Sequence, residues 1–167
     1  MSEFKDLQSD PITVESVSDM DDVIAVLKDL VEVCLDGVYG FKACAEQAKR
    51  TDLKSIFTQR ADDCSRAAQQ LNELIRASGG SVEEHGTAMG ALHRGWVAVK
   101  SALSSYDDKA VLEEAERGED RAKTSYAKAL REPMPADLKL IVEQQMQGVI
   151  RNHDQIRSLR DQARAIG

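Results

Sequence analysis

Aromatic residues, proline and cysteine are all scarce in this sequence. Aromatic residues make up 4% of its 167 residues, and it contains three prolines and three cysteines. So few prolines leave room for long helices, because proline breaks a helix interior. An odd number of cysteines without metal-site spacing argues against a disulfide framework, so we expect reduced, buried thiols at Cys34, Cys44 and Cys64. The abundant residues are instead helix formers such as Ala, Leu, Glu, Lys, Arg and Gln, which predicts an all-α fold.

The sequence also lacks long apolar runs and an excess of positive charge. No run approaches the roughly 20 apolar residues of a membrane-spanning helix, and the N-terminus shows neither the basic start nor the apolar stretch of a secretion signal. A net charge of −7 would repel a phosphate backbone, and no cluster of Lys and Arg interleaved with aromatic residues offsets it. These absences predict a cytoplasmic protein whose partners are neither nucleic acid nor membrane.

The chain is long enough for one domain with a substantial core. Residues 1–17 are polar, contain Pro11 and show no sustained period, so we expect a flexible N-terminal arm. Ser18 can serve as the N-cap of a first helix, because aspartates follow it in the first turn, where carboxylates favour the helix dipole. Residues 18–167 are therefore expected to form a single domain.

Apolar residues at helical spacing predict four long helices, at about residues 18–48, 51–78, 105–130 and 135–163. Thr51 is expected to cap the second helix, and the glycines at 79 and 80 to end it in a left-handed conformation. The first and second helices should form an antiparallel hairpin, because the connection between them is short.

A shorter helix is expected from about Ala88 to Leu103, between the second and third long helices. At 1.5 Å per residue it would span about 24 Å, enough to carry the chain back along the bundle. This predicts two antiparallel hairpins joined by a crossover, as in ferritin-like bundles. The alternative is one kinked helix over 88–130 in a simple up-down bundle. The capping signal at SSYDD, from Ser105 or Asp107, favours the crossover.

Several charged or polar residues fall on helix faces that are otherwise apolar. A helical wheel places Glu119 near the centre of the third long helix's apolar face and Glu116 at its edge. His153 and Arg60 lie on the corresponding faces of the last and second helices. Because buried charges are normally paired, we expect a buried polar network of Arg60, Glu116, Glu119 and His153. Gly118 beside them indicates a close helix contact or room for a small molecule.

The alternative use of these residues is a single metal ion held by Glu116, Glu119 and His153. Ferritin-like di-metal proteins need inward carboxylates on all four helices and a Glu-x-x-His pair on two of them. No histidine here has a glutamate three residues before it, and outward positions are expected for the first helix's Asp29, Glu32 and Asp36. Arg60 would also compete with a cation. The spacing therefore favours a salt-bridge network without a cofactor.

Four segments carry a family resemblance: GALHRGWVAVKSAL, EEAERGEDRAKTSYAKAL, PMPADLKLIVEQQ and NHDQIRSLRD. In this order they resemble a bacterial family of ferritin-like four-helix-bundle proteins that is known only as a domain of unknown function. The resemblance covers residues 18–162. It implies a ferritin-like bundle and no established activity, substrate or cofactor.

The function expected from the sequence is that of a non-enzymatic, cytoplasmic ferritin-like bundle. It would act through protein contacts, in a stress-related role and as a homodimer, since small oligomers are the usual state of such proteins. One alternative is a metal-binding or redox enzyme with a degenerate ferritin-like site inside the bundle. Another is a small-molecule pocket near Gly118.

Overall fold

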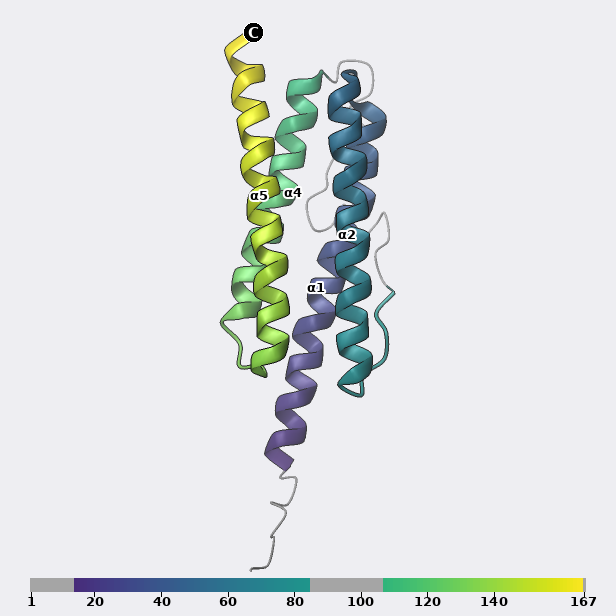
Figure 1. Cartoon of the computed structure of the whole chain (residues 1–167), viewed down its shortest axis with the longest axis vertical. Helices are drawn as coiled ribbons and strands as arrows, with labels where there is room; N and C mark the ends of the chain where they lie inside the picture. Colours follow the sequence, from purple (N-terminus) through teal and green to yellow (C-terminus); the bar gives the residue numbers. More distant parts are fainter. Residues whose placement is uncertain (1–13, 85–106, 167) are drawn as a thin grey trace, which may run out of the picture.

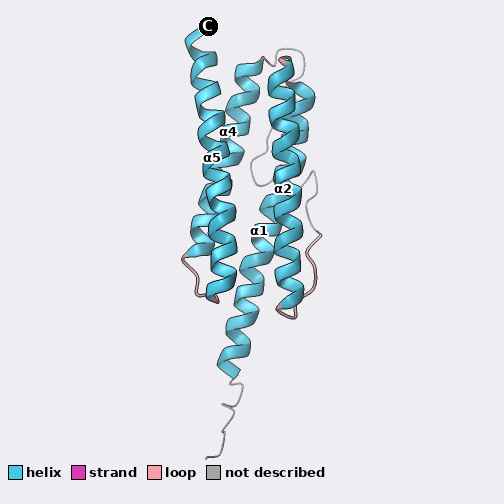
Figure 2. Ribbon diagram, in the orientation of Figure 1, coloured by secondary structure: helices cyan, strands magenta, loops and turns pink. Residues whose placement is uncertain are grey.

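The computed structural model describes residues 14–84 and 107–166, with the backbone alone for residues 14–18. This part of the chain contains four helices and no strand (Figure 1, Figure 2), so the predicted all-α class is confirmed. The helices are α1 (Val14–Gln47), α2 (Thr51–Ala77), α4 (Asp108–Leu130) and α5 (Ala136–Ile166). The short helix predicted at 88–103 lies outside the described residues, as does most of the predicted N-terminal arm.

The four helices form two hairpins that pack side by side. α1 packs along α2, and α4 packs along α5 (Figure 1). The hairpins meet mainly through α1 and α4, and α2 touches α5 over a smaller area. The predicted pairing of α1 with α2 is therefore confirmed.

The start of α4 lies beside the connection between α1 and α2. The Asp108 carboxylate accepts hydrogen bonds from the backbone N–H groups of Lys49, at 2.6 Å, and Arg50, at 3.2 Å. α2 and α4 therefore begin at the same end of the bundle and run in the same direction (Figure 1). These directions differ from those of a simple up-down bundle and agree with two hairpins joined by a crossover.

The helix ends confirm some predicted caps and correct others. Asp107 is the N-cap of α4, and its carboxylate accepts from the Ala110 N–H at 2.8 Å, as one of the two predicted options required. Gly79 has φ +90°, the left-handed conformation predicted after α2. The prediction for Thr51 is wrong: Arg50 is the N-cap, without a side-chain cap bond, and Thr51 is the first helical residue. α1 begins at Val14, so Ser18 lies within the helix and is not its N-cap.

The core consists of two apolar clusters that lie at different levels of the bundle. The first includes Phe41, Phe57 and Leu112, and the second includes Leu27, Leu71 and Val142, among others. Between the two clusters, α4 carries Glu116 and Glu119, and α5 carries His153. On α2, Arg60 lies within the first cluster, between Phe57 and Cys64. The polar residues therefore gather in a polar layer where the two apolar halves of the core meet.

Candidate functional site

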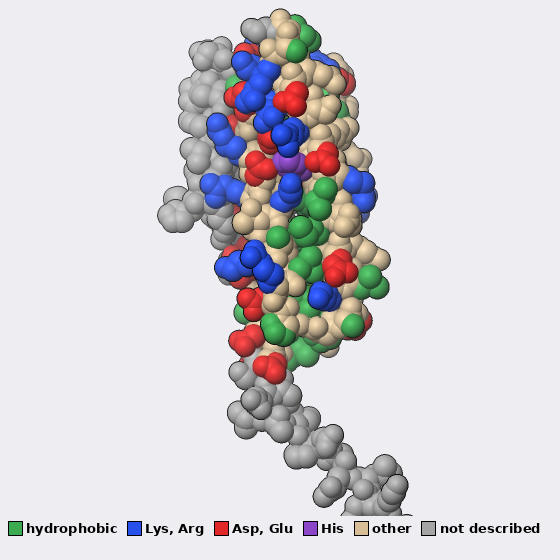
Figure 3. Space-filling model, turned by 90° about the vertical axis from the view of Figure 1, so that its left-hand side faces the viewer, with side chains coloured by type: hydrophobic (Ala, Val, Ile, Leu, Met, Phe, Trp, Pro, Cys, Tyr) green, Lys and Arg blue, Asp and Glu red, His purple; other side chains and the backbone are tan. Residues whose placement is uncertain are grey.

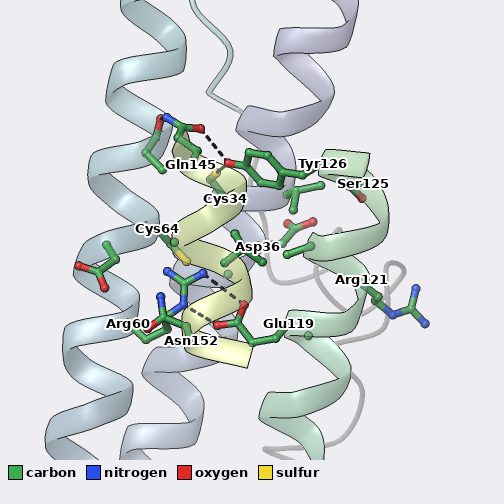
Figure 4. A pocket seen from close by; sticks show the side chains of 18 of the residues that line it. Cys34, Asp36, Arg60, Cys64, Glu119, Arg121, Ser125, Tyr126, Gln145 and Asn152 are labelled. Atoms are coloured by element: carbon green, nitrogen blue, oxygen red, sulfur yellow. Dashed lines mark hydrogen bonds and ion pairs between the residues drawn. The ribbon is translucent and has the colours of Figure 1, made fainter. Parts of the chain in front are cut away.

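Arg60 of α2 and Glu119 of α4 meet in the interior of the bundle. Arg60 Nε donates to Glu119 Oε1 at 2.5 Å, and Nη2 donates to Oε2 at 3.3 Å (Figure 4). This fork-to-fork geometry is the strongest arrangement between a guanidinium and a carboxylate. The Arg60 guanidinium also lies 5.3 Å from the centroid of the Phe41 ring, within the range of a cation–π contact. This ion pair therefore joins α2 to α4, and Phe41 of α1 packs against its guanidinium.

The electrostatics of this pair reflect its burial. The Glu119 side chain is completely buried, and burial raises its pKa above the ordinary value, although the charge of Arg60 and its hydrogen bonds act in the opposite direction. Burial alone would lower the pKa of Arg60, but the nearby Cys64 side chain and the carboxylate of Glu119, which also accepts its hydrogen bonds, raise that pKa. Each charge therefore depends on its partner, because an unpaired charge in this position would cost several kcal/mol, on the order of the penalty for a broken buried pair.

Glu116 and His153 lie in a different place, on the seam between α4 and α5. The Glu116 carboxylate accepts a hydrogen bond from Arg160 Nη1, and Arg160 Nη2 also donates to Asp161 at 2.8 Å. The sequence predicted one network of Arg60, Glu116, Glu119 and His153, and the structure divides these residues between two clusters. The clusters are neighbours, since Glu119 and the Asp120 carboxylate beside His153 belong to consecutive residues of α4.

His153 is the centre of the second cluster. Its side chain is 5% exposed, and it lies between two carboxylates: Nε2 is 2.7 Å from Asp120 Oδ1, and Nδ1 is 3.2 Å from Asp154 Oδ1. Both aspartates are exposed, so acidic side chains flank the nearly buried histidine on its solvent side. Asp120 is 57% exposed, so the cluster is open to solvent on one side.

The residues that could hold a metal ion differ from the predicted set at one position. Ligand atoms of Glu116, Asp120 and His153 all lie within 4.8 Å of one another. Glu119, which the sequence placed in this set, points the other way and binds Arg60. Asp120, one residue later in α4, lies beside His153 instead.

Asp120 and Arg160 are the site residues that the sequence analysis missed. Glu116 and Asp120 are four residues apart and so share one face of α4. His153 and Arg160 are seven residues apart, which again places them on one face of α5. These spacings could have shown that each pair shares a helix face. They could not show which face of α4 packs against α5, because a helical wheel describes one helix at a time.

Asp36 of α1 is also placed differently from the prediction. It was expected to project outward, but it is 2% exposed and lines a cavity between the helices. Figure 4 shows it in the polar layer, near Tyr126 and Glu119. α1 therefore does contribute a carboxylate to the interior, because the adjacent helices cover more of its surface than its apolar stripe indicated.

The cavity has a volume of about 1270 Å³ and runs through the polar layer. Its lining includes Cys34, Arg60, Glu119 and Tyr126, which project toward one another in Figure 4. Gly118 also lines it, in agreement with the space expected near that residue. The cavity is a mixed polar and apolar space with one internal ion pair.

A family model for a domain of unknown function, DUF2383, matches residues 22–132. The chain belongs to this family. No curated protein matches the chain significantly. The matched range contains the interior pair of the DUF2383 domain, Arg60 and Glu119, but ends before His153 and Arg160 of the seam. Within residues 14–84 and 107–166, no helix is long and apolar enough to cross a membrane.

A chain of hydrogen bonds crosses the interior of this DUF2383 chain. Tyr126 Oη donates to Gln145 Oε1 at 2.8 Å, and Gln145 Nε2 donates to Gln70 Oε1 at 2.8 Å. Tyr126 Oη also lies 3.3 Å from Cys34 Sγ, so the Cys34 thiol can donate to it. These bonds link all four helices at the level of the cavity (Figure 4).

All three cysteines are free and buried, as predicted. Burial raises the pKa of Cys34 to about 11 and also raises the pKa values of Cys44 and Cys64. Burial likewise raises the pKa of Tyr126. These groups are therefore protonated at neutral pH, and a protonated thiol is a poor nucleophile.

Proposed function

We propose that this protein is a non-enzymatic, ferritin-like four-helix bundle of the cytoplasm that acts through protein contacts, including contacts with a second copy of itself. The observation that carries this proposal is the buried pair of Arg60 and Glu119. The pair lies in the bundle core, where ferritin-like proteins build their metal centres. The directions of the four helices support the ferritin-like assignment.

The interior pair argues against metal chemistry in the core for an electrostatic reason. Two cations in a ferritin-like core need several anionic oxygens to offset their charge. Here the fully buried Glu119 already faces the positive charge of Arg60. A metal ion bound to Glu119 would lie beside that guanidinium and would be repelled by it. The carboxylate is therefore neutralised by a side chain of the same protein.

The surface offers features that suit protein contacts. Leu140 at the start of α5 is 53% exposed, and Figure 3 shows hydrophobic side chains gathered over the lower half of the α4–α5 face. Lys, Arg, Asp and Glu side chains occupy the upper half of the same face. An apolar area beside mixed charges is typical of a protein interface. A homodimer with two-fold symmetry is the simplest assembly that such a surface can form.

The test compares the wild type with a core variant and a surface variant. The double substitution Arg60→Met with Glu119→Leu removes both core charges, and Leu140→Lys changes the exposed apolar residue. Sedimentation velocity over a range of concentrations should show self-association in the wild type and in the core variant, and weaker association in Leu140→Lys. A strict monomer that also recovers no cross-linked partner contradicts the proposal. Loss of association in a folded core variant would indicate that the function depends on the buried pair and not on the surface.

The cavity favours a second candidate, in which the interior binds a small molecule or houses a degenerate metal or redox site. Ligand pockets usually have volumes of about 300–1,000 Å³, and this cavity is of that order at about 1270 Å³. Cys34 and Tyr126 are oxidisable groups in its wall. Native mass spectrometry of gently purified protein tests this candidate: a co-purified ligand supports it, and unmodified chain mass contradicts it. Ala122→Leu, which adds volume to the wall, should expel such a ligand.

A further inference from the structure

We propose that the seam between α4 and α5 binds one divalent transition-metal ion of the zinc type. Its ligands would be the side chains of Glu116, Asp120 and His153, which we call the seam site. The site is distinct from the interior pair of Arg60 and Glu119, and the inference is independent of the function proposed above.

The three ligands already lie near the positions that a metal requires. Their ligand atoms are all within 4.8 Å of one another. Around a zinc ion with bonds of about 2.1 Å, the ligand atoms lie about 3.4 Å apart. Asp120 already lies within that distance of His153, at 2.7 Å, and is 57% exposed, so it can yield without disturbing the core. Glu116, one turn earlier on α4, needs a rotation of its flexible side chain.

The surroundings of His153 point to a positive charge at its Nε2 atom. A neutral imidazole carries one N–H, so it can donate to one carboxylate and must present a lone pair at the other nitrogen. His153 has a carboxylate oxygen at each nitrogen, at 2.7 Å and 3.2 Å. If Nδ1 donates to Asp154, the Nε2 lone pair faces an oxygen of Asp120. That arrangement is favourable only with a proton or a metal ion at Nε2.

Asp154 has the position of an outer-shell partner. Histidines that bind metals almost always donate their other ring N–H to a carboxylate or carbonyl, which fixes the tautomer and makes the ligating nitrogen more basic. In the tautomer with a proton on Nδ1, Asp154 accepts from Nδ1 in this way and leaves Nε2 to face Asp120. Carboxylate and imidazole groups are both ligands that zinc accepts, and three protein ligands leave a fourth position open to water.

Arg160 is the competitor for this site. Its guanidinium binds Glu116 and also Asp161. A metal ion at the seam site must displace Arg160 from Glu116, but Asp161 can keep the guanidinium in place on α5. The structure therefore predicts that removing Arg160 strengthens metal binding, whereas removing an ordinary salt-bridge partner would only weaken the protein.

The experiment is a titration of the full chain with Co²⁺, followed by its d–d absorption, and with Zn²⁺ in competition. The wild type should take up about one ion per chain, in line with a three-ligand site. Asp120→Asn and His153→Ala should abolish the Co²⁺ spectrum, and Asp154→Asn should weaken binding by roughly 10–100-fold. Arg160→Gln should bind more tightly than the wild type.

Two control variants separate the seam site from other sources of binding. Glu113 pairs with Arg164 across the same two helices, at 3.1 Å, but lies outside the site. Glu113→Gln should therefore leave Co²⁺ binding unchanged. Replacement of the other two histidines, His85 and His93, by alanine should also leave it unchanged. Circular dichroism of each variant establishes that it is folded. If His153→Ala does not fold, Asp120→Asn still tests the site, because position 120 is exposed and the substitution should not disturb the core.

Either of two results overturns the proposal. The first is the absence of saturable Co²⁺ or Zn²⁺ binding to the wild type and to Arg160→Gln. The second is binding that persists with the same affinity in folded Asp120→Asn. Both results would leave the interior pair and the protein-contact function untouched, so failure here is distinguishable from failure of the function proposed above.

Discussion

Arg60 and Glu119 are each unfavourable inside the bundle alone and stable as a pair. Replacing Arg60 by Met, or Glu119 by Leu, should lower the free energy of unfolding by about 3–5 kcal/mol, because the partner is left buried without a counter-charge. The double variant should recover most of that loss, since apolar pairs replace buried ion pairs at little cost. Urea denaturation followed by circular dichroism measures all three. Additive losses in the double variant would show that the two residues act independently.

Glu114 is another buried carboxylate, and its situation differs from that of Glu119. One oxygen accepts from Arg117, and the other, Oε2, is buried without a hydrogen-bond partner among residues 14–84 and 107–166. Burial raises the pKa of Glu114, and the charge of Arg117 only partly opposes this. Such a group favours the folded state most when it is protonated, below its ordinary pKa of 4.5. That contribution is lost as the pH rises through the higher pKa of the folded state.

Glu114→Gln should therefore stabilise the protein at neutral pH. The effect should be smaller at about pH 4, which is close to the pKa of a glutamate in the unfolded chain. The measurement is the difference in unfolding free energy between variant and wild type, from urea titrations at both pH values. Glu113→Gln, at the exposed pair with Arg164, is the matched control and should show no such change. A stabilisation that is equal at both pH values would contradict the assignment.

At the scale of helices, α1 and α2 approach each other closely at Gly37. A Cβ atom at this position would lie 2.8 Å from Cys64 Sγ, which is too close for a normal contact. Alanine is a better helix former than glycine by about 1 kcal/mol, but overpacking costs about 1–3 kcal/mol. Gly37→Ala should therefore destabilise the protein. In a Cys64→Ala background the clash is gone, and the same substitution should stabilise it.

Thermal unfolding of the four proteins in this cycle measures the coupling between the two positions. The predicted result is a change of sign for Gly37→Ala when Cys64 is replaced. If Gly37→Ala destabilises equally in both backgrounds, the glycine is required for a reason other than the contact with Cys64.

The helices were largely predictable from the sequence because each depends on its own periodicity and on nearby residues. The buried positions of Arg60, Glu119 and His153 follow from the wheel, and the cap at Asp107 follows from the capping signal at SSYDD. What the wheel could not provide is the direction from which a neighbouring helix approaches. Adjacent residues on a helix differ by 100°, so a moderate error in packing direction exchanges Glu119 for Asp120 beside His153.

At the scale of the whole molecule, the three thiols report on its opening. All are buried in the core, and the raised pKa values keep them protonated at neutral pH. Labelling with a thiol reagent at about pH 8 should therefore be slow in the native protein and should accelerate with denaturant, because reaction requires opening. Mass spectrometry of labelled chains gives the rate for each cysteine. Rapid labelling of Cys34 in the native protein would contradict its placement beside Tyr126.

The arrangement of the two hairpins was predictable in outline from the connection lengths, whereas the cavity and the seam were not. A cavity arises from the positions of four helices together, and Asp36 faces it although its own helix indicated otherwise. In the whole molecule, Glu119 is paired with Arg60 and is not available as a metal ligand, so we expect metal ions to bind outside the core.

Native mass spectrometry of the intact chain, after incubation with Zn²⁺ or Fe²⁺, tests this claim most directly. The proteins to compare are the wild type, Glu119→Gln and His153→Ala. The structure predicts the same metal content in the wild type and Glu119→Gln, and a lower content in His153→Ala. Metal that is present in the wild type and absent from folded Glu119→Gln would place the ion in the core and contradict the account.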